Sequence, residues 1–155
     1  MRRQELAVAD MAQMEAILRK AKIVRLGLCR DNSPYIVPMV FGYEPGRIYT
    51  HAAKEGHKLD IIRANPRVCF EVDIDHEFVI GAKSCECGIK YRSVIGFGKA
   101  SIVSDLADAK HGLQVIMQHC AGKKPEFTDR ETESVAVIRV DIESMTGKTR
   151  YKEPL

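Results

Sequence analysis

The chain has 155 residues, a length that fits one domain with an ordinary core. Hydrophobic residues make up 45% and charged residues 29%, and the net charge of +3 includes no long basic run, so a nucleic-acid partner is not expected. Apolar stretches are too short for a membrane span or signal peptide, and five cysteines without such a signal are typical of reduced thiols. We therefore expect one cytoplasmic domain over residues 1–155, with no membrane or nucleic-acid partner.

Near the N-terminus, helical spacing of apolar residues predicts an amphipathic helix over Asp10–Ala21. Alternating residues then predict a half-buried strand over 23–29 and, after a turn, a second strand over 35–43. Pro38 lies inside that second strand. Because proline cannot donate to a ladder, we expect a bulge, a sheet edge or an opening for a ligand there.

The middle of the chain also combines strand and helix patterns. A third strand is predicted over 47–53, followed by a short helix over 55–65 that ends before Pro66. The stretch "RVCFEVDI" alternates apolar and polar residues over 67–74. A turn is expected directly after it, at Asp75–His76.

The last third predicts a long strand over 91–104, an amphipathic helix over 105–122 and a final strand over 134–144. Strands dominate and most follow one another through short turns, unlike the alternation of a doubly wound sheet. This order favours a mainly β protein, a single antiparallel barrel with helices packed outside. Edge strands of so small a barrel are commonly covered by a second subunit, so we expect a homodimer.

The stretch "THAAKEGHKL" carries several groups able to hold an anion. A helix that begins near Gly56 exposes unpaired N–H groups at the positive end of its dipole. Gly56 permits close approach of a ligand, the Lys58 ammonium lies in the first turn, and Thr50 and His51 add donors. These features favour a phosphate site; the alternative is that Lys58 and His57 are solvated surface residues.

Two further groups leave alternatives open. Arg92 has a planar fork of donors suited to a phosphate or carboxylate, but it could equally be an exposed arginine on a sheet face. Cys85 and Cys87 flank Glu86 without a second cysteine pair, so no metal site is expected, and they are either redox-active thiols or simple loop residues. We find no hydrolase motif, which suggests that a bound cofactor does the chemistry.

Two blocks, "VPMVFGYEPGRIYTHAAKEGHKLDIIRANPRVCFEVD" and "KYRSVIGFGKASIV", resemble the pyridoxamine 5′-phosphate oxidase-like FMN-binding split-barrel family. The most similar branch is the Nim group, associated with reduction of 5-nitroimidazole drugs. The resemblance spans about residues 10–147. It implies an antiparallel six-stranded split β-barrel with two to three outer helices, and a homodimer that binds FMN at the subunit interface, with haem as the less favoured cofactor.

The resemblance also implies particular site residues. Backbone groups of Pro38, Met39 and Val40 would lie along the flavin ring, and Thr50 and His51 would approach the ribityl chain and phosphate. Lys58 would bind the phosphate, and His51 is also the candidate catalytic residue. The remaining candidates are on one barrel strand, either of the same chain or of the partner subunit: Tyr91, Arg92 and Ser93.

The activity implied by the resemblance is that of an FMN-dependent, nitroreductase-like oxidoreductase. Electrons would pass from a nicotinamide donor through FMN to a small acceptor such as a nitroaromatic or quinone. True pyridoxamine phosphate oxidase activity is not expected, because the oxidases carry an Arg-x-His arrangement near the C-terminus and this chain has no histidine after His119. The alternative is a non-catalytic haem- or flavin-binding protein.

Overall fold

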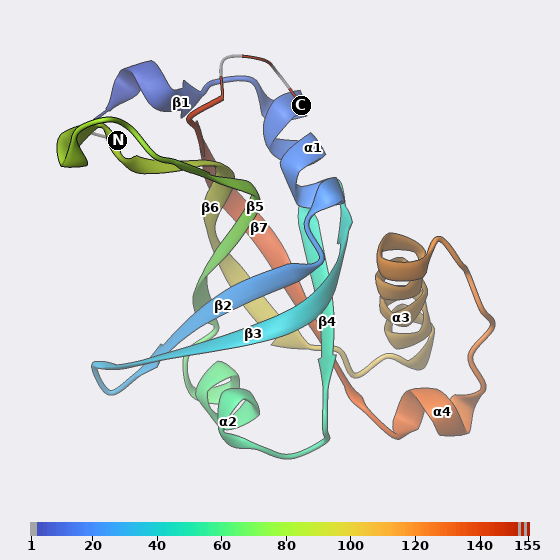
Figure 1. Cartoon of the computed structure of the whole chain (residues 1–155). Coiled ribbons are helices and arrows are strands. Elements are labelled where there is room, and N and C mark those ends of the chain that lie inside the picture. The colour runs from blue at the N-terminus through green and yellow to red at the C-terminus, as the bar shows by residue number, and fades with distance from the viewer. Residues whose placement is uncertain (1–2, 152, 154) are drawn as a thin grey trace.

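The computed structural model of the chain describes residues 3–151, 153 and 155. The strands are β1 (Ala7–Val8), β2 (Ile23–Arg30), β3 (Ser33–Glu44), β4 (Arg47–Ala52), β5 (Arg67–Val79), β6 (Gly88–Ile102) and β7 (Ala136–Thr149). The α-helices are α1 (Met11–Lys20), α2 (His57–Ala64), α3 (Leu106–Ala121) and α4 (Asp129–Glu133), with short 3-10 helices at Gln4–Leu6 and Ser84–Glu86. Figure 1 shows the strands wound around a common axis with the helices at the periphery.

The sheet closes into a six-stranded ring. Its strand order is β1-β7-β4-β3-β2-β5-β6, and an additional β7–β6 pairing joins the ends of the ring. Every pairing is antiparallel, and the two-residue β1 attaches to β7 outside the ring. The predicted antiparallel six-stranded barrel is therefore confirmed.

Alternating side chains fill the barrel. On β5 the predicted inward residues are all buried: Val68, Phe70, Val72 and Ile74. Each large apolar side chain removed from water in this way contributes roughly 1.5–3 kcal/mol before entropy costs. The ends of the barrel are covered by α1 on one side and α2 on the other, as the opposite positions of these helices in Figure 1 show.

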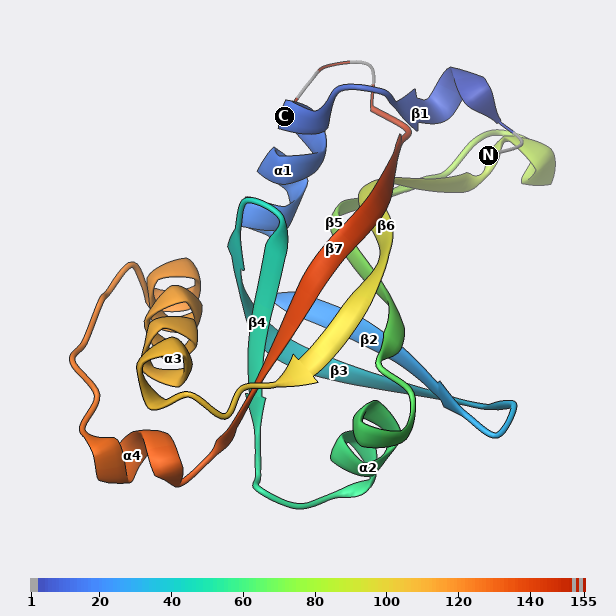
Figure 2. The same ribbon diagram turned by 180° about the vertical axis from the view of Figure 1, so that it is seen from behind.

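Helix α3 packs outside the barrel, against β3 and β4, rather than over an end (Figure 2). The approach is close because Gly42 of β3 lies under the α3 backbone. A Cβ atom at Gly42 would lie 2.6 Å from backbone atoms of Val115 and Ile116. A second apolar cluster, which includes Tyr49, fills the space between α3, β4 and β7.

The expected turn at Asp75–His76 is wrong. Strand β5 runs through these residues to Val79, and a register shift between Ile74 and Glu77 absorbs them as a bulge. Asp75 has a φ of 57°, which gives it the local geometry of a turn residue although the strand continues. The consequence is a hairpin arm, made of residues 75–91, that projects from the barrel (Figure 1).

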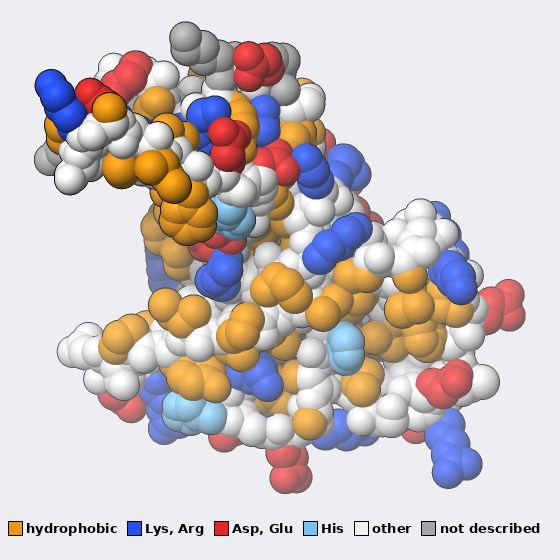
Figure 3. Space-filling view, viewed as in Figure 1, with side chains coloured by type: hydrophobic (Ala, Val, Ile, Leu, Met, Phe, Trp, Pro, Cys, Tyr) orange, Lys and Arg blue, Asp and Glu red, His pale blue; other side chains and the backbone are white. Residues whose placement is uncertain are grey.

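The arm carries exposed apolar side chains. Phe78 is 80% exposed and Ile80 is 89% exposed. In Figure 3 the surface is hollowed between this arm, at the upper left, and the body of the molecule. Exposed apolar residues of this size on a projecting element are typical of an interaction surface.

The helices also differ in number from the expectation. Four α-helices are present among the described residues, where two to three were expected. The extra helix is α4, whose N-cap residue Thr128 and third residue Glu131 form a reciprocal capping box. Five residues are too few to show helical periodicity, so only the capping residues carried a signal.

Candidate functional site

Strands β3 and β4 separate in the region of Pro38. Their pairing ends at Phe41 and Thr50, whereas β3 stays paired with β2 as far as Ser33. Residues 33–40 therefore have β2 on one side and, among the described residues, no strand on the other. The edge expected at Pro38 is confirmed, and the β2–β3 register passes through it without a bulge.

The apex of this opening is closed by one side-chain hydrogen bond. The Thr50 hydroxyl donates to the Val40 carbonyl over 2.9 Å, and Thr50 is only 1% exposed. Met39 points into the core at 8% exposure, whereas Val40 is 42% exposed. The structure thus brings Pro38, Met39, Val40 and Thr50 together at the point where the two strands diverge.

Helix α2 begins just after β4. Its N-cap residue Gly56 has a φ of 140°, makes no side-chain cap, and has open space where a Cβ would be. The carbonyl of Gly56 accepts from Leu59 and Asp60, but the first N–H groups of the helix have no intrahelical acceptor. No described residue pairs with the Lys58 ammonium in the same turn. These donors fit an anionic group such as a phosphate.

Tyr91, Arg92 and Ser93 lie elsewhere on the barrel. Arg92 is buried, forms an ion pair with Asp75 at 2.8 Å, and donates to the Glu153 carbonyl at 2.8 Å. Its guanidinium also lies 4.3 Å from the centre of the Tyr151 ring. Lys20 binds the same Asp75, and its hydrogen bond, together with that of Arg92, holds the pKa of this carboxyl below its usual value. Arg92 therefore joins the arm to the C-terminal segment.

Within one chain these residues are far from α2. Strand β6 carries Arg92 near its start and Ala100, which bonds to Pro66 after α2, near its end. At about 3.3 Å per residue, the two positions are roughly 25 Å apart along the strand. Lys58 and Arg92 of one chain are therefore too far apart to hold the same phosphate. If Tyr91, Arg92 and Ser93 contact a cofactor bound by Lys58, they must come from a second copy of the chain.

His51 faces outward from β4 and is exposed. Its side chain lines a cavity of about 270 Å³ together with residues of α3 and α4. Of the residues that line this cavity, His51 was expected from the sequence to be functional, whereas Phe127 and Ser134 were not. The latter two come from the α3–α4 connection and the end of α4, where no periodic pattern marks them.

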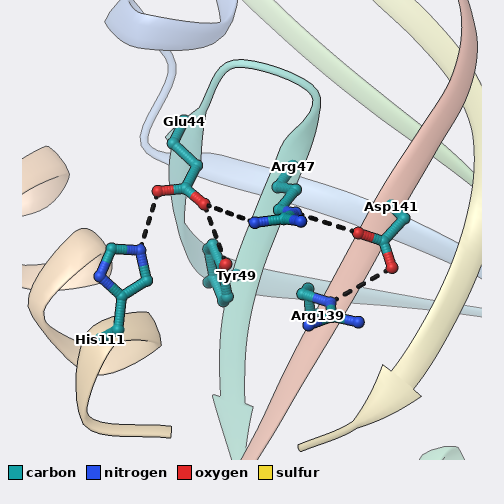
Figure 4. Close-up of polar contacts among 6 residues, drawn as sticks. All are labelled: Glu44, Arg47, Tyr49, His111, Arg139 and Asp141. Atoms are coloured by element: carbon teal, nitrogen blue, oxygen red, sulfur yellow. Dashed lines mark hydrogen bonds and ion pairs between the residues drawn. The ribbon is translucent and has the colours of Figure 1, made fainter. Parts of the chain in front are cut away.

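A polar network occupies the opposite end of β4 (Figure 4). Glu44 accepts from the Tyr49 hydroxyl and binds His111, each at 2.9 Å, and Arg47 lies 3.6 Å away. Arg47 also binds Asp141 at 3.2 Å. Burial raises the pKa of Glu44, but hydrogen bonds from His111 and Tyr49 more than offset this, so its pKa is below the ordinary value.

The thiols of the arm lie away from both regions. Cys85 and Cys87 are exposed at the 3-10 turn, where the Cys87 sulfur lies 3.7 Å from the Lys83 carbonyl oxygen. Over the described residues there is no group of three metal-ligating side chains. Nor does any helix in the described part of the chain have the length and apolar character needed to cross a membrane.

Comparison with solved structures identifies relatives with the same fold. A candidate 5-nitroimidazole antibiotic resistance protein from Bacteroides thetaiotaomicron is 29% identical, with a TM-score of 0.82 over 92% of this chain and 86% of the other. The flavocytochrome Anf3 from Azotobacter vinelandii is 24% identical, with a TM-score of 0.84 over 100% of this chain and 74% of the other.

Sequence comparison adds a curated relative and a family. An uncharacterized protein from Rhizobium meliloti (strain 1021) is 31% identical over 65 residues, and this match spans 42% of each chain. The family model described as pyridoxamine 5'-phosphate oxidase matches residues 10–149, which is nearly the whole chain. The chain therefore belongs to the pyridoxamine 5'-phosphate oxidase family.

Proposed function

We propose that this protein is a flavin-dependent oxidoreductase that binds FMN where β3 and β4 diverge. The observation that carries the proposal is the combination of an unpaired β3 edge, Pro38–Val40, with unpaired donors at the start of α2. The family match and the structural relatives, one a flavocytochrome and one a candidate nitroimidazole resistance protein, support a flavin as the class of cofactor.

The residues of the chain have distinct tasks in this proposal. The β3 edge would offer backbone groups to the flavin ring, and Thr50 would fix the apex by holding the Val40 carbonyl. Lys58 and the α2 N–H groups would hold the phosphate. The bound flavin would supply the electron-transfer chemistry, with a nicotinamide as donor and a small nitroaromatic or quinone as acceptor.

A homodimer is part of the proposal. Tyr91, Arg92 and Ser93 can approach a flavin held by Lys58 only if a second chain supplies them, because they lie at the far end of the barrel. The exposed apolar side chains of the arm, Phe78 and Ile80, support a surface that a second copy would cover.

Identification of the cofactor tests the proposal. The purified protein is unfolded, and the released cofactor is separated by chromatography and identified from its absorption spectrum and mass. We expect FMN at about one molecule per chain, and oxidation of NADH or NADPH by the loaded protein in the presence of a nitroaromatic. A protein that neither retains nor rebinds FMN would refute the proposal.

Haem binding without turnover is the second candidate, favoured by the fold shared with a flavocytochrome. The structure narrows the choice of axial ligand. Hydrogen bonds already engage His76, His111 and His119, whereas no described residue hydrogen-bonds to the side chain of His51 or His57. If haem is the cofactor, a Soret band should appear in the wild-type protein and shift or disappear in either His51→Ala or His57→Ala.

A further inference from the structure

A cavity of about 440 Å³ lies where the end of α1, the β3–β4 hairpin and α3 meet. Figures 1 and 2 show α1 and this hairpin at the upper end of β4 with α3 alongside, whereas α2 lies at the lower end. We call it the α1–α3 cavity. The lining residues that matter below come from four segments: Arg19, Tyr43, Glu44, Val115, Gln118 and Lys124.

Hydrogen bonds join the ends of α1 and α3 beside this cavity. The His119 Nε2 atom lies 2.6 Å from the Ala21 carbonyl oxygen, and the Lys22 ammonium donates to the His119 carbonyl at 2.6 Å. The Gln118 carbonyl accepts from the Gly122 N–H at 3.0 Å. Carbonyls at the negative end of the α3 dipole are therefore occupied, and a positive charge lies next to them. This end of the helix does not oppose an anion in the cavity.

Arg19 is oriented by two contacts that leave part of its guanidinium unused. One terminal nitrogen donates to Glu15 at 3.2 Å, and the guanidinium carbon lies 5.1 Å from the centre of the Tyr43 ring. No described residue bonds to the other two nitrogens. Contact with an aromatic face restricts an arginine side chain, and its planar fork matches the two oxygens of a carboxylate. Arg19 is therefore a pre-oriented donor on the α1 side of the cavity.

Lys124 lies on the other side of the cavity, in the connection that follows α3. Gly122, with a φ of 66°, ends the helix in the left-handed conformation. The Gln114 amide donates to the Pro125 carbonyl at 3.2 Å, which holds this connection against α3. No described residue pairs with the Lys124 ammonium or the Gln118 side-chain amide. Unused donors from separate segments therefore line one cavity.

Glu44 is the acidic residue among the described residues of the lining. One of its oxygens accepts from the Tyr49 hydroxyl and the other binds His111, each at 2.9 Å, while Arg47 lies 3.6 Å away. Both oxygens thus already have a partner within the chain, and Arg47 offsets the charge. The cationic groups that remain without an acidic partner favour an anionic ligand, and the charge of Glu44 favours one negative charge over two.

We propose that the α1–α3 cavity binds a small organic molecule that carries one carboxylate. The carboxylate accepts from the free nitrogens of Arg19 and from the Lys124 ammonium, as charge-assisted hydrogen bonds. The Gln118 amide adds a neutral donor, and Val115 offers an apolar contact to the rest of the molecule. The site is separate from the donors of α2, so it goes beyond the proposed flavin function and does not depend on it.

Direct binding of benzoate tests the proposal. Benzoate is titrated into the isotopically labelled protein, and amide shifts are followed by two-dimensional NMR. We expect saturable shifts centred on Val115, Gln118 and Lys124, and no comparable shifts with benzamide, which has a similar shape without the charge. Shifts centred on α2 would overturn the proposal, as would equal binding of benzamide. Inorganic phosphate that binds as tightly as benzoate would overturn the assignment to a carboxylate.

Two adjacent lysines provide a matched pair of variants. Lys123 and Lys124 are both exposed, but only Lys124 lines the cavity. An exposed ion pair contributes modestly, so we expect Lys124→Gln to weaken benzoate binding by about three- to fivefold. Lys123→Gln should leave the affinity unchanged. Equal weakening in both variants would show a general effect of charge and overturn the site.

A second pair of variants tests the planar fork of Arg19. Arg19→Gln removes the charge and the fork and should weaken benzoate binding by about tenfold. Arg19→Lys keeps the charge and should recover only part of this loss. An affinity in Arg19→Gln equal to that of the wild type would overturn the proposal. Because Arg19 also pairs with Glu15, the melting temperature of each variant is measured, and the lysine pair decides if Arg19→Gln does not fold.

Discussion

The two ends of β4 differ in how their polar side chains are used. At its start, Glu44, Arg47 and Tyr49 form a network that continues through His111 and Asp141 (Figure 4). Near its other end, no described residue pairs with the side chain of His51 in β4 or of Lys58 in the following helix α2. Both ends are rich in polar residues, so composition alone does not separate them.

Whether a polar side chain has partners within the chain distinguishes residues that stabilise the fold from residues that are available to a ligand. A side chain whose donors and acceptors are satisfied within the chain contributes to folding, and its removal leaves partners unpaired. A side chain without partners contributes little to folding, and its removal is felt only when a ligand is present. Substitutions at the network end should therefore change stability, and substitutions at the open end should change binding.

The largest expected effect is at Gly42, next to the network end. In Gly42→Ala the new Cβ would lie 2.6 Å from the α3 backbone, so the helix must move. Overpacking of this kind should cost about 3 kcal/mol, a decrease of about 6–12 °C in melting temperature. Thermal unfolding followed by circular dichroism measures it. Gly88→Ala is the control, because its Cβ would meet only the end of the flexible Arg150 side chain; equal destabilisation of both variants would contradict the prediction.

The second effect is at the open end. Lys58→Ala removes the ammonium that is proposed to bind the phosphate, at a cost of about 1.5–3 kcal/mol, which is roughly a ten- to hundredfold weaker FMN affinity. Fluorescence titration of the apoprotein with FMN measures the change. The melting temperature without FMN should stay the same, because no described residue pairs with Lys58. If Lys58→Ala lowers the melting temperature but leaves the FMN affinity unchanged, Lys58 stabilises the fold and does not bind the phosphate.

The third effect returns to the network. Glu44→Ala leaves the hydroxyl of Tyr49, a residue only 3% exposed, without its acceptor, which should cost about 1–2 kcal/mol of stability. Glu44→Gln keeps an acceptor and should cost less. Chemical unfolding compares the two, with FMN affinity unchanged in both. If the alanine variant is as stable as the wild type, the network does not stabilise the fold.

The sequence predicted the parts of the fold that depend on local patterns. Alternation identified the inward residues of β5, and the order of strands and helices indicated an antiparallel barrel. The helix start at Gly56 was also predicted, and the anion site that Gly56 and Lys58 indicate there stays a prediction. These features need only residues close together in the chain.

Features that depend on distant residues were not predictable in this way. Aspartate is one of the residues that adopt a positive φ, so Asp75 resembles a turn residue in the sequence, and it does have a φ of 57°. Only the pairing of β5 with the distant strand β6 shows that the strand continues past it. Arg92 is buried by Asp75, Tyr151 and Glu153, which lie far from it in sequence. The cavity beside His51 combines a residue of β4 with residues of helices more than 50 positions later in the chain, and α4 itself is too short for a periodic pattern.

The smallest expected effect concerns acid stability where α3 meets the end of β3. The His119 Nδ1 atom accepts from the Tyr43 N–H at 3.3 Å, and its Nε2 atom lies 2.6 Å from the Ala21 carbonyl oxygen. Burial, with Lys22 and Arg19 nearby, lowers the pKa of His119 despite the bond to Ala21. Protonation of Nδ1 would remove the Tyr43 bond, which is worth about 1 kcal/mol.

The sign of the pH dependence follows from the lowered pKa. Because the unfolded state binds the proton more tightly than the folded state, the stability from neutral His119 is present above the ordinary histidine pKa and is lost as the pH falls below it. Melting temperatures between about pH 5 and 8 should therefore decrease on acidification in the wild type. His119→Gln keeps a donor and an acceptor without titrating, so its curve should be flatter. Parallel curves would show that another group causes the acid sensitivity, and an increase in melting temperature on acidification would contradict the neutral state of His119.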